Sequence, residues 1–300
     1  MRGLDYRWIE TLDAVVDYRS FEKAAKKLCI SQSAVSQRIK QLEKWSSQPV
    51  LVREQPPRAT LVGQKLLGLY RRVSLLEQDL LPDLNSSDSD LPIDVSIATN
   101  ADSLATWLLP SLAPILLESK LALNFIVDDE NRTLEKLRTG EVVGAICIEN
   151  NSIPGCVADF LGVSEYICVA SPDFCQRYFS DGVTRESLMK APAVVFNQYD
   201  HMHEQFIQKN FSLSITSVVK HTVRSSEAFV NLTTLGVAYS LIPKLQISDE
   251  LKKGSLVNIV PELSISNPLY WHHWQLESGV LKQLSNAIIQ YAKEKLPQQK

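Results

Sequence analysis

The side chains with the most specific chemistry lie in one short N-terminal segment, where polar and basic residues recur at helical spacing. If residues 32–45 form a helix, its inward stripe is Val35, Ile39 and Leu42. Its first two turns and outward face then carry Gln32, Ser33, Ser36, Gln37, Arg38 and Lys40. Glutamine pairs bidentately with adenine and arginine with guanine, while serine bonds to bases or phosphates. This set therefore predicts contacts to base edges, with Lys40 and Lys44 better suited to phosphates.

A helix that braces this segment is predicted directly before it. After a possible N-cap at Ser20, an apolar stripe at the spacing i, i+3, i+4, i+7 is formed by Phe21, Ala24, Ala25 and Leu28. The small alanines allow another helix to cross closely, and Ser31 can cap that helix after a two-residue connection. Together with a helix over 6–18, this order predicts a helix-turn-helix whose last helix enters the major groove of DNA. An ordinary surface helix accounts for the outward lysines but not for the caps, the tight turn and the alanines together.

A short strand over 50–53, a proline-containing turn and a return strand at 58–59 predict a wing beside the recognition helix. Arg53 and Arg58 are therefore candidates for contacts to phosphates or to the minor groove. Residues 19–72 hold 12 lysines and arginines against 3 aspartates and glutamates, although the net charge of the chain is −3. A basic module on an acidic body is typical of a nucleic-acid-binding domain joined to a second functional unit.

A long leucine-rich helix is predicted from about residue 61 to residue 81, after a possible N-cap at Thr60. Its apolar surface is larger than one helix can bury between two domains. Pairing with the same helix of a second chain would bury this surface, and a two-fold dimer would read two half-sites on DNA. Packing against its own domains is the alternative. The polar, proline-bracketed stretch 82–92 then marks a domain boundary.

Strands and helices alternate beyond this stretch, which predicts an α/β body with a parallel sheet. The first cycle has strands at 93–99, 121–130 and 142–150, the second begins with a strand at 166–172, and a helix over 278–295 closes the chain. We expect a winged helix-turn-helix domain over 1–60, a linker helix and linker over 61–91, and a body over 92–300. Lobe one covers about 92–164 and 268–300, and lobe two about 165–267. Two such lobes leave a cleft in which small ligands bind.

Several other classes of protein are disfavoured. Five cysteines without C-x-x-C spacing indicate reduced thiols rather than disulfides, namely Cys29, Cys147, Cys156, Cys168 and Cys175. The pairs His201/His203 and His272/His273 lack partners at ligand spacing, so neither a metal nor another cofactor is expected. No nucleotide-binding or nucleophile motif indicates an enzyme. A transport-type solute-binding protein would explain the lobes but not the DNA-binding start, and the absence of an apolar signal core favours the cytoplasm.

The N-terminal residues resemble those of the LysR-type transcriptional regulators. The matching positions are Ser20 through Ala25, Leu28, Ser31 through Ser36, Ile39, Leu42, Glu43, Arg53, Thr60 and Gly63. The resemblance extends over essentially the whole chain, because that family's effector domain is a two-lobed α/β body of the periplasmic-binding-protein type. Stretches such as "KLCISQSAVSQRIKQLE", "ADSLATWLLP", "GEVVGA" and "SSEAFV" resemble its lysine- and arginine-responsive branch.

The resemblance implies a regulator that binds double-stranded DNA, senses lysine or arginine, and controls genes of basic amino-acid export or metabolism. It also implies a homodimer or homotetramer and contact with RNA polymerase. A different small-molecule effector stays open, as does inhibition of replication initiation, a label that some members of the branch carry. One departure is Ser47, which stands where the family usually has a glycine and would be strained in a left-handed turn.

The resemblance places effector contacts at two strand–helix junctions, one in each lobe. The residues are Thr99, Asn100, Asp102 and Ser103 in lobe one and Ser225, Ser226 and Glu227 in lobe two. Helix N-termini suit the carboxylate of an amino acid, because free amides and the helix dipole favour an anion. The distal cation needs a carboxylate, for which Asp128, Asp129 and Glu130 are candidates at the end of a strand. Capping or solvation is the alternative role of these acids.

Overall fold

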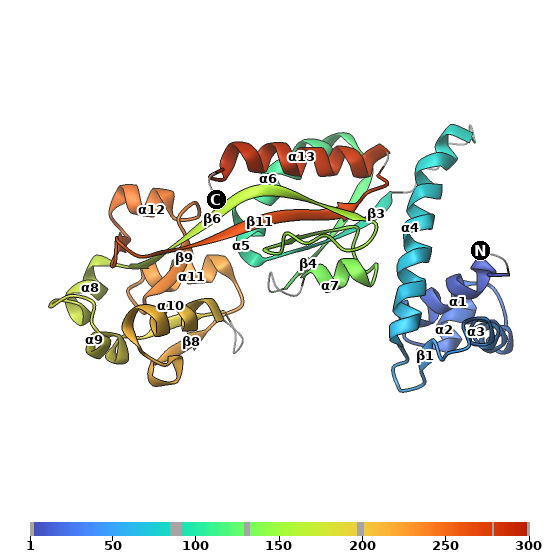
Figure 1. Ribbon diagram of the computed structural model, residues 1–300, viewed down its shortest axis with the longest axis horizontal. Helices are drawn as coiled ribbons and strands as arrows, with labels where there is room; N and C mark the ends of the chain where they lie inside the picture. Colours follow the sequence, from blue (N-terminus) through green and yellow to red (C-terminus); the bar gives the residue numbers. More distant parts are fainter. Residues whose placement is uncertain (1–2, 85–91, 129–132, 197–200, 278, 299–300) are drawn as a thin grey trace.

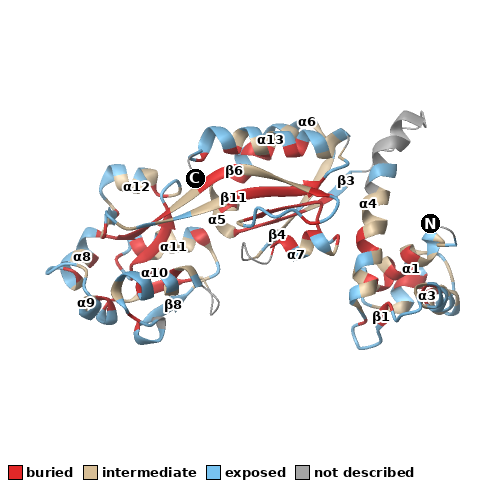
Figure 2. Ribbon diagram, viewed as in Figure 1, coloured by how far each residue is buried: buried red, intermediate tan, exposed pale blue. Residues whose placement is uncertain are grey.

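The computed structural model describes residues 3–84, 92–128, 133–196, 201–277 and 279–298. Three parts follow one another along its longest axis: an N-terminal helical domain with a long helix, a central lobe and an outer lobe (Figure 1). We call the central part lobe one and the outer part lobe two. Buried residues gather inside each part (Figure 2). None of the helices in the described ranges combines the length and apolarity needed to cross a membrane.

The N-terminal domain consists of three helices and a two-stranded antiparallel wing. Its elements are α1 (Tyr6–Asp17), α2 (Phe21–Lys27), α3 (Gln32–Ser46), β1 (Leu51–Val52) and β2 (Arg58–Ala59). The predicted inward stripe of α3 is fully buried against Ile9 and Leu12 of α1 and Ala24 of α2. The predicted winged helix-turn-helix is confirmed.

Side-chain caps begin both helices of the motif. The Ser20 Oγ accepts the Lys23 amide at 3.3 Å, and the Ser31 Oγ accepts the Ala34 amide at 3.2 Å. Each cap satisfies an amide that the first helical turn leaves without a partner. Ser47 ends α3 with a φ of 54°, so the left-handed turn is present without the glycine that suits it.

The long helix α4 (Leu61–Leu84) begins as a fourth helix of the N-terminal domain. Leu67 is buried in that domain's core, and a Cβ at Gly63 would lie 2.1 Å from the Val50 carbonyl oxygen. The predicted helix end at residue 81 is too early, because α4 continues to Leu84. Most of the predicted linker, 85–91, lies outside the described residues.

Lobe one contains the predicted β–α–β–α–β order. Its parallel strands are β3 (Ile93–Thr99), β4 (Leu121–Val127) and β5 (Gly144–Cys147), with β3 between the other two. Its helices are α5 (Ala101–Ser103), the π-helical turn η1 (Leu104–Leu108), α6 (Leu109–Glu118), α7 (Thr133–Arg138) and α13 (Gly279–Lys295). The expected parallel unit and closing helix are therefore confirmed.

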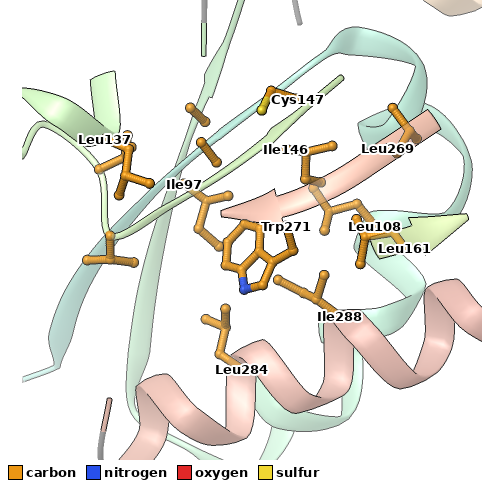
Figure 3. Close-up of a cluster of buried hydrophobic side chains, with 14 of the residues drawn as sticks. Ile97, Leu108, Leu137, Ile146, Cys147, Leu161, Leu269, Trp271, Leu284 and Ile288 are labelled. Atoms are coloured by element: carbon orange, nitrogen blue, oxygen red, sulfur yellow. The ribbon is translucent and has the colours of Figure 1, made fainter. Parts of the chain in front are cut away.

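The core of lobe one surrounds the fully buried ring of Trp271 (Figure 3). Ile97, Leu284 and Ile288 are among the apolar side chains of this core. The indole Nε1 donates to the Ser285 Oγ at 2.8 Å, which satisfies the one polar atom of the ring. A Cβ at Gly144 would lie 2.1 Å from the ring, so the indole occupies space that only a glycine leaves open.

Two long antiparallel strands, β6 (Cys156–Ala170) and β11 (Ser264–Trp274), run through both lobes (Figure 1). The strand order of the sheet is β10-β6-β11-β5-β3-β4, in which β10 is Val257–Asn258, and β9 (Ser240–Pro243) also pairs with β6. The prediction of a strand only from residue 166 misses the first part of β6. Asp159 and Gly162 interrupt the apolar pattern there, whereas the structure maintains the pairing with β11.

Lobe two completes the body with short elements. They are β7 (Ala193–Val195), β8 (Lys220–Thr222), β10 (Val257–Asn258), α8 (Pro172–Tyr178), α9 (Arg185–Lys190), α10 (His201–Phe211), η2 (Ile215–Ser217), α11 (Ser226–Thr234) and α12 (Ser248–Lys253). Of these, α8, α9, α12 and β10 have no counterpart in the predicted elements. Each is much shorter than the window of about 11–18 residues over which a helical hydrophobic period can be recognised, or, for β10, than the alternation of about 4–8 residues that indicates a strand.

A buried histidine at the end of β11 is held between two carboxylates. The His273 Nδ1 lies 2.9 Å from the Glu277 Oε2, and its Nε2 lies 3.0 Å from the Asp159 Oδ2. Burial lowers the pKa of His273, but the hydrogen bonds and charges of both carboxylates outweigh it, so the pKa is raised. The folded protein therefore favours the protonated ring.

We expect His273 to make the stability of the protein depend on pH. With a raised folded-state pKa, its contribution is fully present below the unfolded pKa of about 6.5 and is lost as the pH rises through the folded pKa. Urea unfolding at several pH values measures this effect. As the pH rises through the folded-state pKa, the free energy of unfolding should fall less for His273→Asn than for the wild type. His221→Asn is the control, because His221 is exposed on β8. Equal pH dependence of the wild type and His273→Asn would contradict the expectation.

Candidate functional site

The outward face of α3 presents most of the side chains that the sequence predicts as DNA contacts. Gln32, Ser33, Gln37, Lys40 and Lys44 are exposed, Ser36 is half-buried, and Arg53 and Arg58 of the wing are exposed. Because the cap at Ser31 starts the helix directly before Gln32, the side chains of Gln32, Ser33, Ser36 and Gln37 occupy its first two turns. In a helix-turn-helix these turns contact base edges.

A groove of about 710 Å³ lies between the start of α3 and the wing. Gln32 and Ser36 line it from α3, and Arg53 lines it from the wing. Arg19, which directly precedes the cap of α2, also lines the groove and is exposed, and it is not among the predicted DNA contacts. The sequence feature that could have identified Arg19 is a basic residue directly before a serine that caps a helix. The groove thus brings predicted base contacts and a predicted phosphate contact onto one surface.

Glu43 connects the recognition helix to the wing. Its Oε1 accepts the Val50 amide at 3.3 Å, and its Oε2 lies 3.5 Å from the Arg53 guanidinium. The Arg53 side chain remains 60% exposed, so it can still reach a phosphate while the carboxylate orients it. The wing therefore has a defined position relative to α3.

Arg38 lies differently from the other predicted DNA contacts. Its guanidinium Nη1 donates to the Thr11 Oγ1 at 3.4 Å, and the side chain is half-buried against α1. In this structure Arg38 braces α3 instead of joining the outward face. Contact between Arg38 and a guanine remains a prediction that would require this hydrogen bond to break.

The two predicted effector junctions meet at Asp102. The Ser226 Oγ of lobe two donates to the Asp102 Oδ1 at 2.5 Å, and the Tyr166 hydroxyl of β6 donates to its Oδ2 at 2.7 Å. Ser226 is the first residue of α11, whose dipole favours a nearby negative charge. One carboxylate of lobe one therefore contacts both lobe two and the strand that joins the lobes.

Gln246 extends this network. Its side-chain amide lies 2.8 Å from the Ser226 Oγ. Because a hydroxyl carries one proton, which Asp102 receives, the amide fits the network when its nitrogen donates to Ser226. Neither Tyr166 nor Gln246 is predicted as a site residue from the sequence. No local pattern marks them, since they reach Asp102 and Ser226 only through the folding of β6 and of the segment after β9.

The other predicted residues of lobe one shape the backbone at this junction. Thr99, Asn100 and Ser103 are buried, and the Asn100 Oδ1 caps α5 by accepting the Ser103 amide at 3.0 Å. The half-buried Asp128 donates its backbone amide to the Thr99 carbonyl oxygen at 3.1 Å, so the ends of β3 and β4 lie together. Asp129 and Glu130 lie outside the described residues.

The predicted residues of lobe two divide into a cap, a contact and an exposed acid. The Ser225 Oγ caps α11 by accepting the Ala228 amide at 3.2 Å, whereas Ser226 contacts Asp102. Glu227 is exposed and accepts a hydrogen bond from the Ser225 hydroxyl at 2.9 Å. Of the acids proposed for the effector cation, Asp102 is thus the one shown between the lobes within the described ranges.

A cavity of about 280 Å³ opens beside Asp102. Trp107 of η1, Glu165 of β6 and Lys244 after β9 are among its lining residues. The Lys244 ammonium lies 3.1 Å from the Glu165 carboxylate. The volume is near the lower end of the range of about 300–1,000 Å³ typical of small-molecule sites.

The five cysteines are free thiols, and the described residues contain no cluster that could hold a metal ion. Cys147, Cys156 and Cys168 are buried, and burial raises the pKa of Cys156 to about 12. Within the described ranges, no three histidine, cysteine or acidic side chains are arranged to hold a metal ion. The His272 Nε2 instead lies 2.7 Å from the Glu149 carbonyl oxygen.

Two family models match this chain. Residues 6–64 match the model of the bacterial regulatory helix-turn-helix protein of the lysR family, and residues 95–293 match the LysR substrate binding domain. The first model spans the helix-turn-helix, the wing and the start of α4. The second spans both lobes, including the junctions that meet at Asp102.

Relatives of known name align over nearly the full length. The HTH-type transcriptional regulator ArgP of Photobacterium profundum is 64% identical over 298 residues, which is 99% of this chain and 100% of that protein. The crystal structure of ArgP from Mycobacterium tuberculosis has a TM-score of 0.89 at 33% identity, covering 99% of this chain and 100% of that one. Full-length LysG from Corynebacterium glutamicum with bound effector Arg has a TM-score of 0.82 at 31% identity, covering 98% and 100%.

These relatives are named as transcriptional regulators, which agrees with the expectation that the chain is not an enzyme. The amino-terminal match covers the exposed polar face of α3, and the second match covers the two-lobed body with the description of a substrate binding domain. The chain therefore belongs to the LysR family of bacterial DNA-binding transcriptional regulators.

Proposed function

We propose that this regulator binds lysine or arginine between its lobes and, in response, controls genes of basic amino-acid export or metabolism. The observation that carries the proposal is the carboxylate of Asp102, which lies between the lobes with Ser226 and Tyr166 as donors. A basic amino acid has an ammonium or guanidinium group that such a carboxylate can bind. The similarity to LysG with bound effector Arg and to proteins named ArgP supports the same class of ligand.

The remaining groups of an amino acid also have chemical counterparts at the junctions. The carboxylate of the ligand suits the amides at the N-terminus of α11, which Ser225 caps. Asp102 would then receive a cationic group, and its present hydrogen bonds to Ser226 and Tyr166 hold it in place for that contact. Asp128, Asp129 and Glu130 remain candidates for a second cationic group.

Self-association is part of the proposal. Leu61 and Leu76 of α4 are 74% and 41% exposed, which suits pairing with α4 of a second chain. On α6, Leu109 and Leu117 are also exposed, the latter by 87%, so the body has a second apolar surface for a tetramer. Such an assembly would act on DNA in the cytoplasm, together with RNA polymerase. A regulator with another effector, or an inhibitor of replication initiation, would share the same DNA-binding face.

Calorimetric titration of the full-length protein with arginine and lysine tests the ligand. Norleucine and citrulline are the matched controls, because they keep the amino-acid backbone and chain length but lack the distal charge. We expect saturable binding of arginine, lysine or both, and little or no binding of the uncharged analogues. Equal binding of norleucine would contradict recognition of a cation, and no binding of any of the four would leave the effector unidentified.

A further inference from the structure

The cavity of about 280 Å³ is lined from the start of α12 and from the last residue of α13, two helices that lie on the same side of β6 and β11 (Figure 1). Ser103 and Trp107 line it from lobe one, and Lys244 and Ser248 line it from lobe two. Residues 163–165 of β6 also line it, at the point where this strand passes from one lobe to the other. A molecule in the cavity would therefore touch both lobes.

This cavity is separate from the proposed effector contacts of lobe two. Neither Ser225 nor Ser226, at the start of α11, is among its lining residues. Asp102 does line it, but its two carboxylate oxygens already accept hydrogen bonds from Ser226 and Tyr166. Other groups would therefore have to bind a molecule in the cavity.

One wall of the cavity is the segment that follows α13, and this segment is fastened to β6. The Pro297 carbonyl oxygen accepts the Val163 amide at 2.8 Å. The Gln298 Nε2 donates to the Leu161 carbonyl oxygen at 3.0 Å. Gly162 permits this close contact, because its φ is +141° and an added Cβ would lie 2.5 Å from a side chain of the segment. The wall is thus a fixed part of the fold.

The charged groups of the cavity leave one positive charge unbalanced. The Lys244 ammonium lies 3.1 Å from the Glu165 carboxylate, so these two charges compensate each other. Lys295 forms no ion pair with a described residue, and its Nζ lies 5.6 Å from the centroid of the Tyr291 ring. The ammonium of Lys295 is therefore available to an anion.

A buried hydroxyl of the cavity also lacks a partner. Ser103 is 2% exposed, and its hydroxyl forms no hydrogen bond with a described residue. Buried hydroxyls are nearly always hydrogen-bonded, and a bound molecule can supply the missing partner. Trp107, Val163 and Leu296 add apolar surface to the lining. An organic anion with an apolar body fits this lining better than a bare inorganic ion does.

We infer that the cavity binds a small organic carboxylate, with its carboxylate group on the ammonium of Lys295 and its apolar body against Trp107. The volume suits a molecule the size of phenylacetate, near the lower end of the range for small-molecule sites. The inference goes beyond the proposed function, because it adds a second ligand of another chemical class at a site outside the start of α11.

Calorimetric titration of the full-length protein with phenylacetate and with hexanoate, one aromatic and one aliphatic carboxylate, tests the site. Phenylacetamide is the matched control, because it keeps the shape of phenylacetate without its charge, and inorganic phosphate is an anion without an apolar body. We expect saturable binding of at least one carboxylate, and binding of both controls that is weaker by about fivefold or more. Binding of neither carboxylate, or equally tight binding of either control, would overturn the inference.

Two variants test whether the carboxylate lies in the cavity. Lys295→Gln removes the unbalanced charge at the exposed rim and should weaken its binding about fivefold. Lys293→Gln is the matched control, because Lys293 is an exposed lysine of the same helix that does not line the cavity, and it should leave the affinity unchanged. Leu245→Trp fills the cavity at a position that is 42% exposed and should abolish binding.

Wild-type affinity in Lys295→Gln or in Leu245→Trp would place the carboxylate elsewhere and overturn the inference. If Leu245→Trp fails to fold, the comparison of Lys295→Gln with Lys293→Gln decides. These titrations contain neither arginine nor lysine as a ligand, so their outcome is independent of whether the effector proposal holds.

Discussion

Asp102→Asn should weaken the binding of arginine and lysine by about 2 kcal/mol or more, roughly 30-fold, because it removes the charge that faces the cation. Asparagine keeps the size of the side chain: its oxygen can still accept the proton of one of the two hydroxyls, Ser226 or Tyr166, and its amide nitrogen can donate to the oxygen of the other. The substitution therefore separates the effect of charge from that of shape. Isothermal titration of the full-length variant with both amino acids measures the change.

Two further variants make this result specific. Tyr166→Phe removes one donor to Asp102 but keeps the charge, so it should cost only about 0.5–1.5 kcal/mol. Asp173→Asn removes an exposed charge of α8 at a site with no role in the proposal and should leave the affinity unchanged. Unaltered affinity in Asp102→Asn would move the cation partner to another acid, with Asp128 as the next to test.

Gln32→Ala should reduce discrimination between operator and random DNA by about 1–3 kcal/mol, the range for one bidentate base contact. Gln32 is exposed at the first position of α3 and lines the groove between α3 and the wing. Truncation there removes donors and an acceptor without disturbing the buried stripe. Affinities are measured for a duplex selected by this protein from a random library and for an unselected duplex, at several salt concentrations.

Arg53→Ala should instead weaken binding to both duplexes alike and reduce the salt dependence by about one phosphate contact. The arginine lies on the wing, where its guanidinium is oriented by Glu43 and largely exposed.

Gln41→Ala is the matched control for Gln32→Ala, because Gln41 is an exposed glutamine of the same helix beyond its first two turns. An equal loss on both duplexes for Gln32→Ala would show that Gln32 does not read bases.

The N-terminal domain was predictable from the sequence because its determinants are local. Ser20 and Ser31 cap helices whose amides lie three residues away, and the inward stripe of α3 repeats within one helix. Even the strained Ser47 could be anticipated from its place after the recognition helix. The hydrogen bond of Arg38 could not be anticipated from the sequence, because its partner Thr11 lies 27 positions earlier.

The body was predictable only in part. Periodic apolar runs identified β3, β4, β5 and α13, but the long strand β6 is interrupted by polar residues and by Gly162. Its pairing with β11, more than 90 residues later, maintains the strand. When a strand is stabilised by backbone hydrogen bonds to a strand far away in the sequence, its own local pattern of residues does not reveal it.

The sequence by itself determined the fold class, the capped recognition helix with its outward glutamines and serines, and the membership of the family. Only the tertiary structure decided which acid lies between the lobes, since Asp102 reaches Tyr166 across 64 positions and Ser226 across 124. It alone also placed the segment after α13 against Gly162 of β6. The physical reason is that caps and helical stripes depend on neighbours within one or two turns, whereas a site between lobes depends on how distant strands pair and how helices pack on them.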